Sequence, residues 1–427
     1  MSADAVFVGF GFGAIQAGLF VYEAFRTGQF RRLVVAEVVS EVVEAVRKNG
    51  GYYHVNIAHP NGIEAAIIGP IEIYDPSSER DRESLKGAVA EAQEIATAVP
   101  SVSFYTSEQP GSIHRLLADG LTRKARSSRK QPPAIVYAAE NHNHAAEILE
   151  EQVSGGLDPE AKQEALSKAC FVNTVIGKMS GIVSDAADMH GLAPVTPASS
   201  RAFLVEEFNR ILISQIPEPS GSCFRRGINA FEEKPDLLPF EEAKLYGHNA
   251  THALGAYLGV LSGIDRMAEV RENPALFQFM RDAFLEESGG ALISRHRGID
   301  ALFTPEGYAR YADDLLERMT NPHLRDTAER VGRDPKRKLG WDDRLIGTMR
   351  IVLGEGIRPW RYATGAAAAV ACLHPKLWNE PGADVAPLLE PLWAGVPEGE
   401  RREIISEIKE GWIRVIRWPE NRKAKNI

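Results

Sequence analysis

Cysteine is scarce in this chain of 427 residues. Its three cysteines, Cys170, Cys223 and Cys372, are odd in number and lie far apart. Neither a disulfide framework nor a zinc site built on paired cysteines fits that spacing. The composition therefore favours a reducing compartment, and we expect a cytoplasmic protein.

Positive charge is in deficit as well. The chain has 49 Lys and Arg against 58 Asp and Glu, which gives a formal net charge of −9. Because affinity for nucleic acid depends on neutralising phosphates, this balance argues against a nucleic-acid partner. The basic run RKARSSRK, residues 123–130, is expected to form a solvated loop, with a partner-binding patch as the alternative.

Long uninterrupted apolar runs are missing too. The stretch from Ala5 to Tyr22 has no charged residue, but acidic MSAD precedes it, and four glycines and Gln16 interrupt it. A signal peptide begins with basic residues, and a spanning helix needs about 20 apolar residues. We therefore expect neither a signal peptide nor a membrane partner.

Short apolar runs alternate with helical patterns in the first part of the chain. This order is typical of a parallel sheet with crossover helices. The predicted strands cover residues 5–8, 33–38, 52–58, 101–106, 133–141 and 169–176. The predicted helices cover residues 40–49, 82–98, 111–120 and 159–168.

A glycine turn, GFGFGA, follows the first predicted strand. Gly9-x-Gly11-x-x-Ala14 fits G-x-G-x-x-G/A, in which the glycines allow a tight turn and close approach of a pyrophosphate to a helix N-terminus. Glu37 follows about 20 residues later, at the end of the next apolar run. A carboxylate there accepts hydrogen bonds from ribose hydroxyls and repels a 2′-phosphate. The pattern predicts a Rossmann domain that binds NAD rather than NADP.

The chain is long enough for two domains. Beyond Pro194 and Pro197 the pattern becomes helical, so we predict a Rossmann domain over residues 1–195 and a mostly helical domain over residues 196–427. The helices predicted in the second domain cover residues 240–262, 273–288, 305–319, 322–333, 341–354, 361–374 and 399–415.

The predicted helix at 240–262 contains a lysine, an asparagine and a histidine within nine residues. At about 100° per residue, Lys244 and Asn249 lie about 140° apart with His252 between them, so all three can share one broad face. A lysine whose pKa is lowered by burial can transfer a proton, and an amide can hold a developing alkoxide. The alternative is an amphipathic core helix with three satisfied polar groups.

Two groups of histidines invite a metal interpretation. The first follows a predicted strand in AENHNH, where Glu140, His142 and His144 lie close in sequence but lack an obvious third and fourth ligand. The second is His248-x-x-x-His252, which has Asn249 where a zinc protease has glutamate. We therefore predict no metal site.

Several blocks together resemble one family, the long-chain, metal-independent polyol dehydrogenases. The resembling blocks are GFGFGA with Glu37, AENHNH, FVNTVIGK, KLYGHNATHALGAYLG, LEESGGALISRH and NPHLRDTAERVGRDPKRKLGWDDRLI. They span nearly the whole chain, and the most specific is Lys-x4-Asn-x2-His followed by AYLG. The family usually has VDR where this chain has Ile176-Gly177-Lys178.

The resemblance implies a Rossmann domain followed by a helical domain, with the reaction in the cleft between them. It implies that Lys244 is the general acid/base, that Asn249 and Asn173 hold the alkoxide oxygen, and that His252 orients the substrate. The cofactor contacts implied by the matching blocks come from Gly9, Gly11, Phe12, Gly13, Ala14, Glu37 and Asn141.

A phosphorylated substrate needs cationic donors, and arginine suits phosphate because it can make two parallel hydrogen bonds. Arg295 and Arg297 are the expected donors; a basic cluster over residues 330–338 is a second candidate, and a solvated helix end is the alternative for both. The function expected from the resemblance is NAD-dependent interconversion of a sugar alcohol and its ketose. Mannitol 1-phosphate and fructose 6-phosphate are the first pair to test.

Two alternatives to this function stay open. The substrate can be an unphosphorylated polyol or a hexuronate, or the chain can be a non-catalytic dinucleotide-binding sensor. The expected partners are a small-molecule polyol or ketose and, at most, a second copy of the chain in a homodimer.

Overall fold

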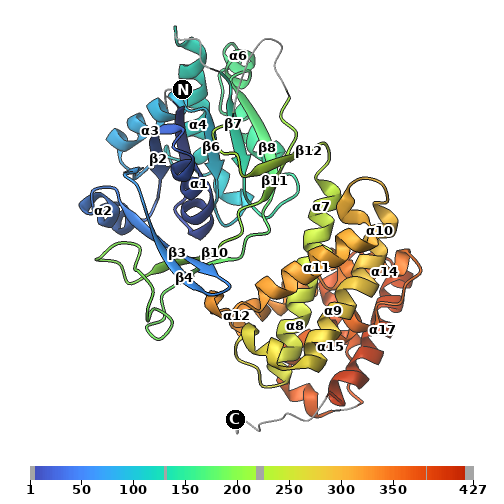
Figure 1. Ribbon diagram of the computed structural model, residues 1–427. Helices are drawn as coiled ribbons and strands as arrows, with labels where there is room; N and C mark the ends of the chain where they lie inside the picture. The colour runs from blue at the N-terminus through green and yellow to red at the C-terminus, as the bar shows by residue number, and fades with distance from the viewer. Residues whose placement is uncertain (1–4, 129–131, 218–225, 381, 419–427) are drawn as a thin grey trace. The chain divides into compact units, whose positions relative to one another are not determined.

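The computed structural model describes residues 5–128, 132–217, 226–380 and 382–418 (Figure 1). The chain divides into two compact units, Met1–Leu238 and Pro239–Ile427. The first unit combines a mostly parallel sheet with helices and the second is helical, which confirms the predicted fold class.

An eight-stranded sheet forms the centre of the first unit. Its strands, in spatial order, are β12 (Phe231–Lys234), β11 (Ile211–Ser214), β8 (Ala169–Val175), β7 (Ala134–Ala138), β6 (Glu94–Thr97), β1 (Ala5–Phe10), β2 (Phe30–Ala36) and β5 (Glu72–Tyr74). The six strands from β8 to β5 are parallel to their neighbours, and β11 pairs antiparallel to β8. In chain order these six strands have the Rossmann arrangement 3-2-1-4-5-6, whose order reverses between β1 and β6.

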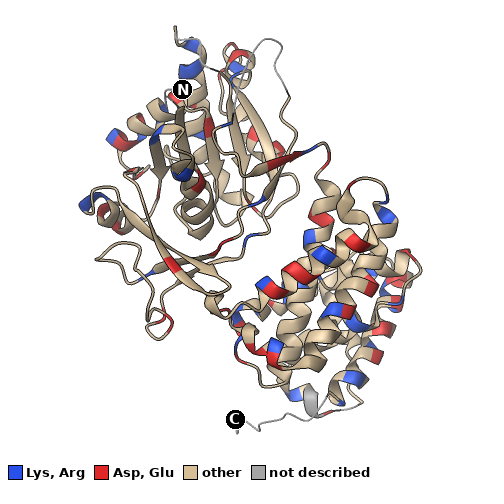
Figure 2. Ribbon diagram, in the orientation of Figure 1, with Lys and Arg blue, Asp and Glu red and all other residues tan. Residues whose placement is uncertain are grey.

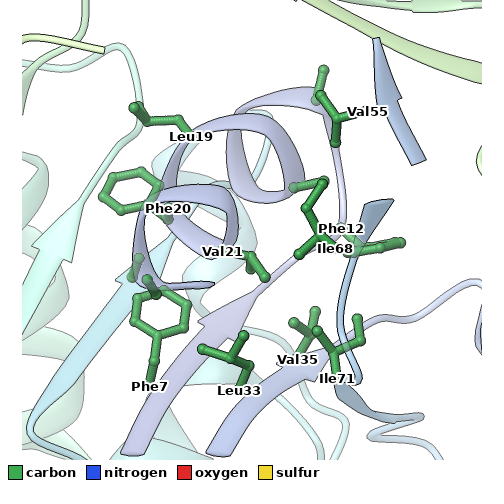
Figure 3. Packing of buried hydrophobic residues seen from close by; sticks show 14 of the residues in the cluster. Phe7, Phe12, Leu19, Phe20, Val21, Leu33, Val35, Val55, Ile68 and Ile71 are labelled. Carbon is green, nitrogen blue, oxygen red and sulfur yellow. The ribbon is translucent and has the colours of Figure 1, made fainter. Parts of the chain in front are cut away.

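The two faces of this sheet bury separate hydrophobic clusters. Along β1, Val6 and Val8 join the cluster beneath α3, α4 and α5, whereas Phe7 joins the cluster beneath η1, α1 and α2 (Figure 3). This alternation follows from the two-residue period of a strand. The helices of this unit are η1 (Gln16–Val21), α1 (Tyr22–Thr27), α2 (Ser40–Lys48), α3 (Glu79–Glu91), η2 (Val102–Tyr105), α4 (Ile113–Arg126), α5 (Ala145–Gly155) and α6 (Lys162–Leu166).

A second, four-stranded sheet packs against the glycine turn. Its order is β4 (Gly62–Ile68), β3 (Tyr53–His59), β10 (Ala202–Glu206) and β9 (Ser180–Val183). The ring of Phe12, from the glycine turn, meets Tyr53 edge to face at 4.9 Å and Phe203 at 5.4 Å between ring centroids. These contacts anchor the turn through a buried aromatic cluster, part of which Figure 3 shows.

One predicted element of the first unit is wrong, and another is wrong in part. The predicted strand 101–106 contains the 3₁₀ helix η2. The predicted helix 82–98 is confirmed as far as Glu91, where α3 ends, but its last residues contain β6. The residues of β6, EIAT, suit a helix as well as a strand, but all four are buried and pair with β1 and β7. Pairing within the sheet therefore overrides the local preference.

The division between the units also differs from the predicted boundary near residue 195. Strands β10, β11 and β12 follow Pro194 and Pro197, and they pair with β3, β8 and one another. The division instead falls between Leu238 and Pro239. Short strands of four or five residues carry too little periodicity to be distinguished from helix by pattern alone.

The second unit is a helical body, and most of its helices coincide with the predicted ones. The predicted helix 322–333 is wrong, because it is divided into the 3₁₀ helix η7 (Pro322–Leu324) and a short α-helix, with Arg325 in the left-handed region between them. The longer elements of this unit are η3 (Ala243–Asn249) with α8 (Ala250–Leu261), α9 (Pro274–Asp282) with η5 (Ala283–Gly289) and α10 (Gly290–Arg295), α11 (Pro305–Met319), α14 (Ile346–Gly354), α15 (Trp360–Leu373) and α17 (Glu398–Ile416). Its shorter elements include α7 (Leu238–Glu242), α12 (Ala328–Gly332) and α13 (Pro335–Lys338). Charged residues are spread over this unit in Figure 2, whereas α8 has none and is almost entirely buried.

Cys170 and Cys372 are free thiols, and Cys223 lies outside the described residues. The prediction of a solvated loop for the basic run 123–130 is wrong at its start, because residues 123–126 form the last turn of α4 and Lys124 is buried. Residues 129 and 130 of this run lie outside the described residues. Within the described ranges, no helix is long and apolar enough to cross a membrane. No group of three or more His, Cys, Asp or Glu in those ranges is arranged to hold a metal ion.

Candidate active site

The glycine turn after β1 has the geometry that its sequence predicts. Gly11 has a φ of +86°, and a Cβ there would lie 2.8 Å from the carbonyl oxygen of Ala98. Both facts require glycine at this position. Gly13 has open space, with nothing within 4 Å of its added Cβ, and a helix begins at Ala14. The turn therefore leaves backbone accessible at the start of a helix, as a pyrophosphate site requires.

Glu37 lies beside this turn. Its Oε2 accepts a hydrogen bond of 2.8 Å from the Phe12 N–H, and its Oε1 accepts one of 2.8 Å from the Val39 N–H. The side chain is buried, and each carboxylate oxygen keeps a lone pair. Glu37 thus stabilises the turn and can still accept hydrogen bonds from two ribose hydroxyls, so the residues present fit NAD.

The AENHNH segment follows β7 at the carboxyl edge of the sheet. Glu140 is buried there and accepts hydrogen bonds from Thr97 Oγ1 at 2.9 Å, from the Val99 N–H at 3.0 Å and from the Tyr105 hydroxyl. Burial raises the pKa of its carboxyl above the usual range. Glu140 therefore organises the loops around the switch point between β1 and β6, and Asn141 follows it as an exposed residue.

Asn173 lies near the end of β8, and its side chain forms hydrogen bonds within the first unit. Its Oδ1 accepts a hydrogen bond of 2.9 Å from the Ala146 N–H, and its Nδ2 donates one of 2.8 Å to Glu147 Oε2. These bonds secure the first turn of α5. An amide nitrogen carries two hydrogens, so one of them remains for another acceptor.

Lys244 and Asn249 both lie in the π-helical segment η3, which continues into α8 with His252. A π-helix joins residue i to residue i+5, so residues five apart lie over one another on successive turns. Lys244 and Asn249 are five apart, and η3 therefore brings them closer to one face than the α-helical angle of about 140° predicts. The three predicted residues thus lie on consecutive turns of one continuous helical segment.

The helix that carries these residues is held firmly. Thr251 Oγ1, beside His252, forms a buried hydrogen bond of 2.7 Å with the hydroxyl of Tyr362, which also bonds Ser288 Oγ at 3.0 Å. Gly247 leaves no room for a side chain, because its added Cβ would lie 2.6 Å from the Tyr308 hydroxyl. Close packing against α11 and α15 fixes the positions of Lys244 and His252.

Lys244 is partly buried, and burial lowers the pKa of its ammonium group to about 8. The nearby positive charge of Arg344 lowers this pKa further, while Glu241 opposes the shift. A lysine with such a pKa exists in both protonation states near neutral pH. That property is what a general acid/base requires.

His252 has a buried Nε2 atom with no hydrogen-bond partner among the described residues. Burial lowers the pKa of its imidazole to about 4, so the ring is neutral at neutral pH. A neutral imidazole has one donor and one acceptor nitrogen, which suits a substrate hydroxyl. His248 stacks on it with ring centroids 6.2 Å apart, and burial lowers the pKa of His248 well below its usual value.

Arg344 is a residue that the sequence reasoning missed. It precedes α14, and its charge lowers the pKa values of Lys244, His248, His252 and Lys338. It was present in the block WDDRLI, but nothing in that block indicated a role for it. Only the folded chain brings it near Lys244, about 100 residues away, because long-range packing is not visible in local patterns.

The two arginines expected to bind phosphate lie elsewhere in the same unit. Arg295 ends α10, is exposed and pairs with Glu242 at 3.1 Å. Arg297 is exposed in the following turn. Arg295 nevertheless lies beside the start of η3, because Glu242 directly precedes η3 and the charge of Arg295 acts on Tyr246. Arg344 differs in that its charge acts on Lys244 itself.

Family models match both units. The mannitol dehydrogenase Rossmann domain matches residues 5–216, and the mannitol dehydrogenase C-terminal domain matches residues 236–399. A mannitol-1-phosphate 5-dehydrogenase of Bacillus pumilus is 30% identical over 366 residues, which cover 85% of this chain and 86% of that protein. A mannitol-1-phosphate 5-dehydrogenase of Pyrenophora tritici-repentis is 27% identical over 340 residues, 80% of this chain and 79% of its own.

Solved structures share the fold at low sequence identity. A D-sorbitol dehydrogenase in substrate-free form superposes with a TM-score of 0.75 at 15% identity, covering 98% of this chain and 94% of its own. A mannitol 2-dehydrogenase of Pseudomonas fluorescens, solved with NAD and D-mannitol, superposes with a TM-score of 0.68 at 15% identity. The superposition covers 97% of this chain and 93% of that dehydrogenase. Sequence and fold agree over both units, and the chain belongs to the mannitol dehydrogenase family.

Proposed function

We propose that this protein is an NAD-dependent, metal-independent polyol dehydrogenase that interconverts a sugar alcohol and its ketose. The observation that carries the proposal is the chemistry of Lys244, a partly buried lysine with a pKa of about 8 on the same helical segment as Asn249. The family relatives support a polyol as the substrate, since those named above are mannitol-1-phosphate 5-dehydrogenases.

In this proposal the first unit holds NAD. The contacts come from the backbone of the glycine turn, from Glu37 at the ribose and from Asn141 after β7; the residues of the turn are Gly9, Gly11, Phe12, Gly13 and Ala14. NAD, when bound, supplies the hydride acceptor for alcohol oxidation and the hydride donor for the reverse reaction. The carboxylate of Glu37 favours a free ribose hydroxyl over a 2′-phosphate.

Lys244 moves the proton. In the oxidising direction its neutral amine takes the proton of the substrate hydroxyl, and in the reducing direction its ammonium returns a proton to the alkoxide oxygen. The Asn249 amide donates a hydrogen bond to that oxygen as charge develops on it. His252 Nε2 binds a neighbouring hydroxyl, which satisfies a buried atom that has no partner within the described part of the chain.

Asn173 is the fourth residue of the proposed catalytic set. Its Nδ2 uses one hydrogen for Glu147, so the second hydrogen is available to a substrate oxygen. The bonds to Ala146 and Glu147 hold the amide in one orientation, and a group fixed in advance stabilises charge better than a mobile one.

A substrate panel tests this function. The wild-type protein is mixed with NADH and, in separate assays, with fructose 6-phosphate, fructose and a ketouronate, while the nicotinamide absorbance is followed. We expect NADH oxidation with at least one ketose and no requirement for added metal. NADH binding without turnover of any compound would instead favour a non-catalytic sensor, and a clear preference for NADPH would contradict the role of Glu37.

A further inference from the structure

The segment that carries Arg344 packs directly against the helix that carries Lys244. Thr348 Oγ1, in the first turn of α14, donates a hydrogen bond of 3.0 Å to the Tyr246 carbonyl and also contacts the Arg344 carbonyl. Gly347 adjoins the same tyrosine, since its added Cβ would lie 2.4 Å from Tyr246 Cε1. The backbone of Arg344 is thereby fixed beside η3, close to Lys244.

The turn that precedes Arg344 is rigid as well. The Asp343 N–H donates a hydrogen bond of 3.1 Å to the Gly340 carbonyl, and the Trp393 indole N–H donates one of 2.7 Å to the Leu339 carbonyl. The Trp341 ring meets Trp393 at 5.3 Å between centroids. A guanidinium on such a turn is held in place before any ligand binds.

The guanidinium of Arg344 has unused donors. Its Nε donates a hydrogen bond of 2.9 Å to Asp343 Oδ1, whereas Nη1 and Nη2 have no partner among the described residues. The side chain is only 14% exposed. The two terminal nitrogens are not among the buried unsatisfied atoms, so they reach solvent and are available to an incoming ligand.

Lys338 is a second cation that interacts electrostatically with Arg344. It is 2% exposed and donates a hydrogen bond to the Arg333 carbonyl, but no carboxylate pairs with it in the described part of the chain. The positive charge of Arg344 contributes to lowering its pKa to about 8, after burial as the larger cause. Around Lys338, the three cations Arg337, Lys338 and Arg344 outnumber the two carboxylates Asp334 and Asp343, and an excess of positive charge favours an anion.

We propose that Arg344, supported by Lys338, binds the phosphate group of a phosphorylated substrate and sets the preference of the enzyme for a polyol phosphate over a plain polyol. A guanidinium with two free terminal nitrogens matches a phosphate, because it can form two parallel charge-assisted hydrogen bonds. This inference rests on the proposed function, since it names the substrate class of the same site. Arg295 also pairs with a carboxylate through Nε, but it is less suited because its side chain is 47% exposed, whereas that of Arg344 is 14% exposed.

Paired kinetics on Arg344→Gln and wild type test the inference. The ratio of kcat/KM for fructose 6-phosphate to that for fructose should fall about tenfold to a hundredfold in the variant, as expected for the loss of charge-assisted hydrogen bonds. Arg344→Lys keeps the charge but not the paired geometry, so it should give an intermediate ratio. If Arg344→Gln does not fold, the ratio measured for Arg344→Lys tests the inference in its place.

Arg402→Gln is the matched control, because Arg402 is an exposed arginine of α17 in the same unit, and it should keep the wild-type ratio. Arg295→Gln and Arg297→Gln test the competing assignment, and a larger fall in either than in Arg344→Gln would overturn the inference. So would a wild-type preference for fructose over fructose 6-phosphate, although that result would leave the proposed function intact.

Calorimetric titration with fructose 6-phosphate and with inorganic phosphate provides a readout that does not depend on turnover. Weaker binding of both by Arg344→Gln supports the inference even if the wild type turns over no ketose, in which case only the proposed function fails. Equal binding by wild type and variant overturns the inference.

Discussion

Lys244 shows how a single side chain acquires its chemistry from its neighbours. Its ordinary pKa is 10.5, and burial together with the charge of Arg344 brings it to about 8. Because each pKa unit corresponds to about 1.4 kcal/mol, the neutral amine becomes readily accessible near neutral pH. The same helix in an exposed position would carry a lysine that is almost fully protonated.

The pH dependence of the reaction should report this pKa. Alcohol oxidation requires neutral Lys244, so its rate should rise with pH and reach half of its maximum near pH 8. Ketose reduction requires the ammonium form and should decline above the same pH. Initial rates measured in both directions between pH 6 and 10 test these two dependences. If the rates of oxidation and reduction both rose, or both fell, with pH, the assignment of Lys244 as the acid/base would be contradicted.

Arg344 provides a second check on these profiles. Replacing Arg344 with glutamine removes a charge that repels the Lys244 ammonium group, so the pKa of Lys244 should rise. The pH dependences of oxidation and of reduction should therefore both shift to higher pH. A shift to lower pH would show that Arg344 does not lie near the Lys244 amine.

At the scale of elements, a buried carboxylate holds two helices of the second unit together. Glu287 lies in η5, and its oxygens accept hydrogen bonds from the Arg361 N–H at 2.8 Å and the Tyr362 N–H at 3.1 Å, in the first turn of α15. These N–H groups have no partner within their own helix. Glu287 therefore serves α15 as a cap supplied by another element, and α15 in turn packs on α8 near the proposed catalytic residues.

Glu287→Ala should destabilise the second unit by about 2 kcal/mol, because it leaves buried backbone donors unsatisfied. Urea unfolding followed by circular dichroism measures the change. Glu286→Ala is the control: Glu286 is exposed and pairs with Arg361 at the surface, so its loss should cost under about 1 kcal/mol. Equal losses in the two variants would contradict the capping role.

This stability contribution should also depend on pH. Burial raises the Glu287 pKa to about 7 in the folded protein, above its ordinary 4.5. A raised pKa stabilises the fold below pH 4.5, and this stabilisation is lost as pH rises through about 7. Glu287→Ala should therefore have a flatter stability profile than wild type over that interval.

The elements that the sequence predicts well are those with a strong local signal. The helix 305–319 coincides with α11, and the glycine turn after β1 has its expected positive φ at Gly11. β6 and β10 to β12 escaped prediction because short strands depend on partners from distant parts of the chain. The π-helical form of η3 was also missed, since the same residues would fit an ordinary helix.

The candidate site divides in the same way. Lys244, Asn249 and His252 could be proposed from the sequence because they share one helix. Arg344 could not, because its proximity to Lys244 depends on the packing of α14 against η3. The internal bonds of Asn173 and Glu37 are likewise tertiary, since each side chain binds backbone N–H groups supplied by another segment.

At the scale of the whole molecule, the two units carry separate parts of the chemistry. The first unit has the Rossmann strand order, the glycine turn and Glu37, all of which suit NAD. The second has the proposed acid/base, the histidine proposed to orient the substrate and the arginine proposed to bind phosphate. A change in the second unit should therefore affect turnover without affecting the affinity of the first unit for NADH.

Lys244→Ala measures this separation and tests the central claim directly. With NADH and the best ketose of the panel, the variant should lose activity by about a hundredfold to ten-thousandfold, the range typical of a general acid/base. Its NADH affinity, measured by fluorescence titration, should equal that of wild type. Turnover near the wild-type rate with unchanged NADH affinity would show that Lys244 is not the acid/base and would contradict the proposed mechanism.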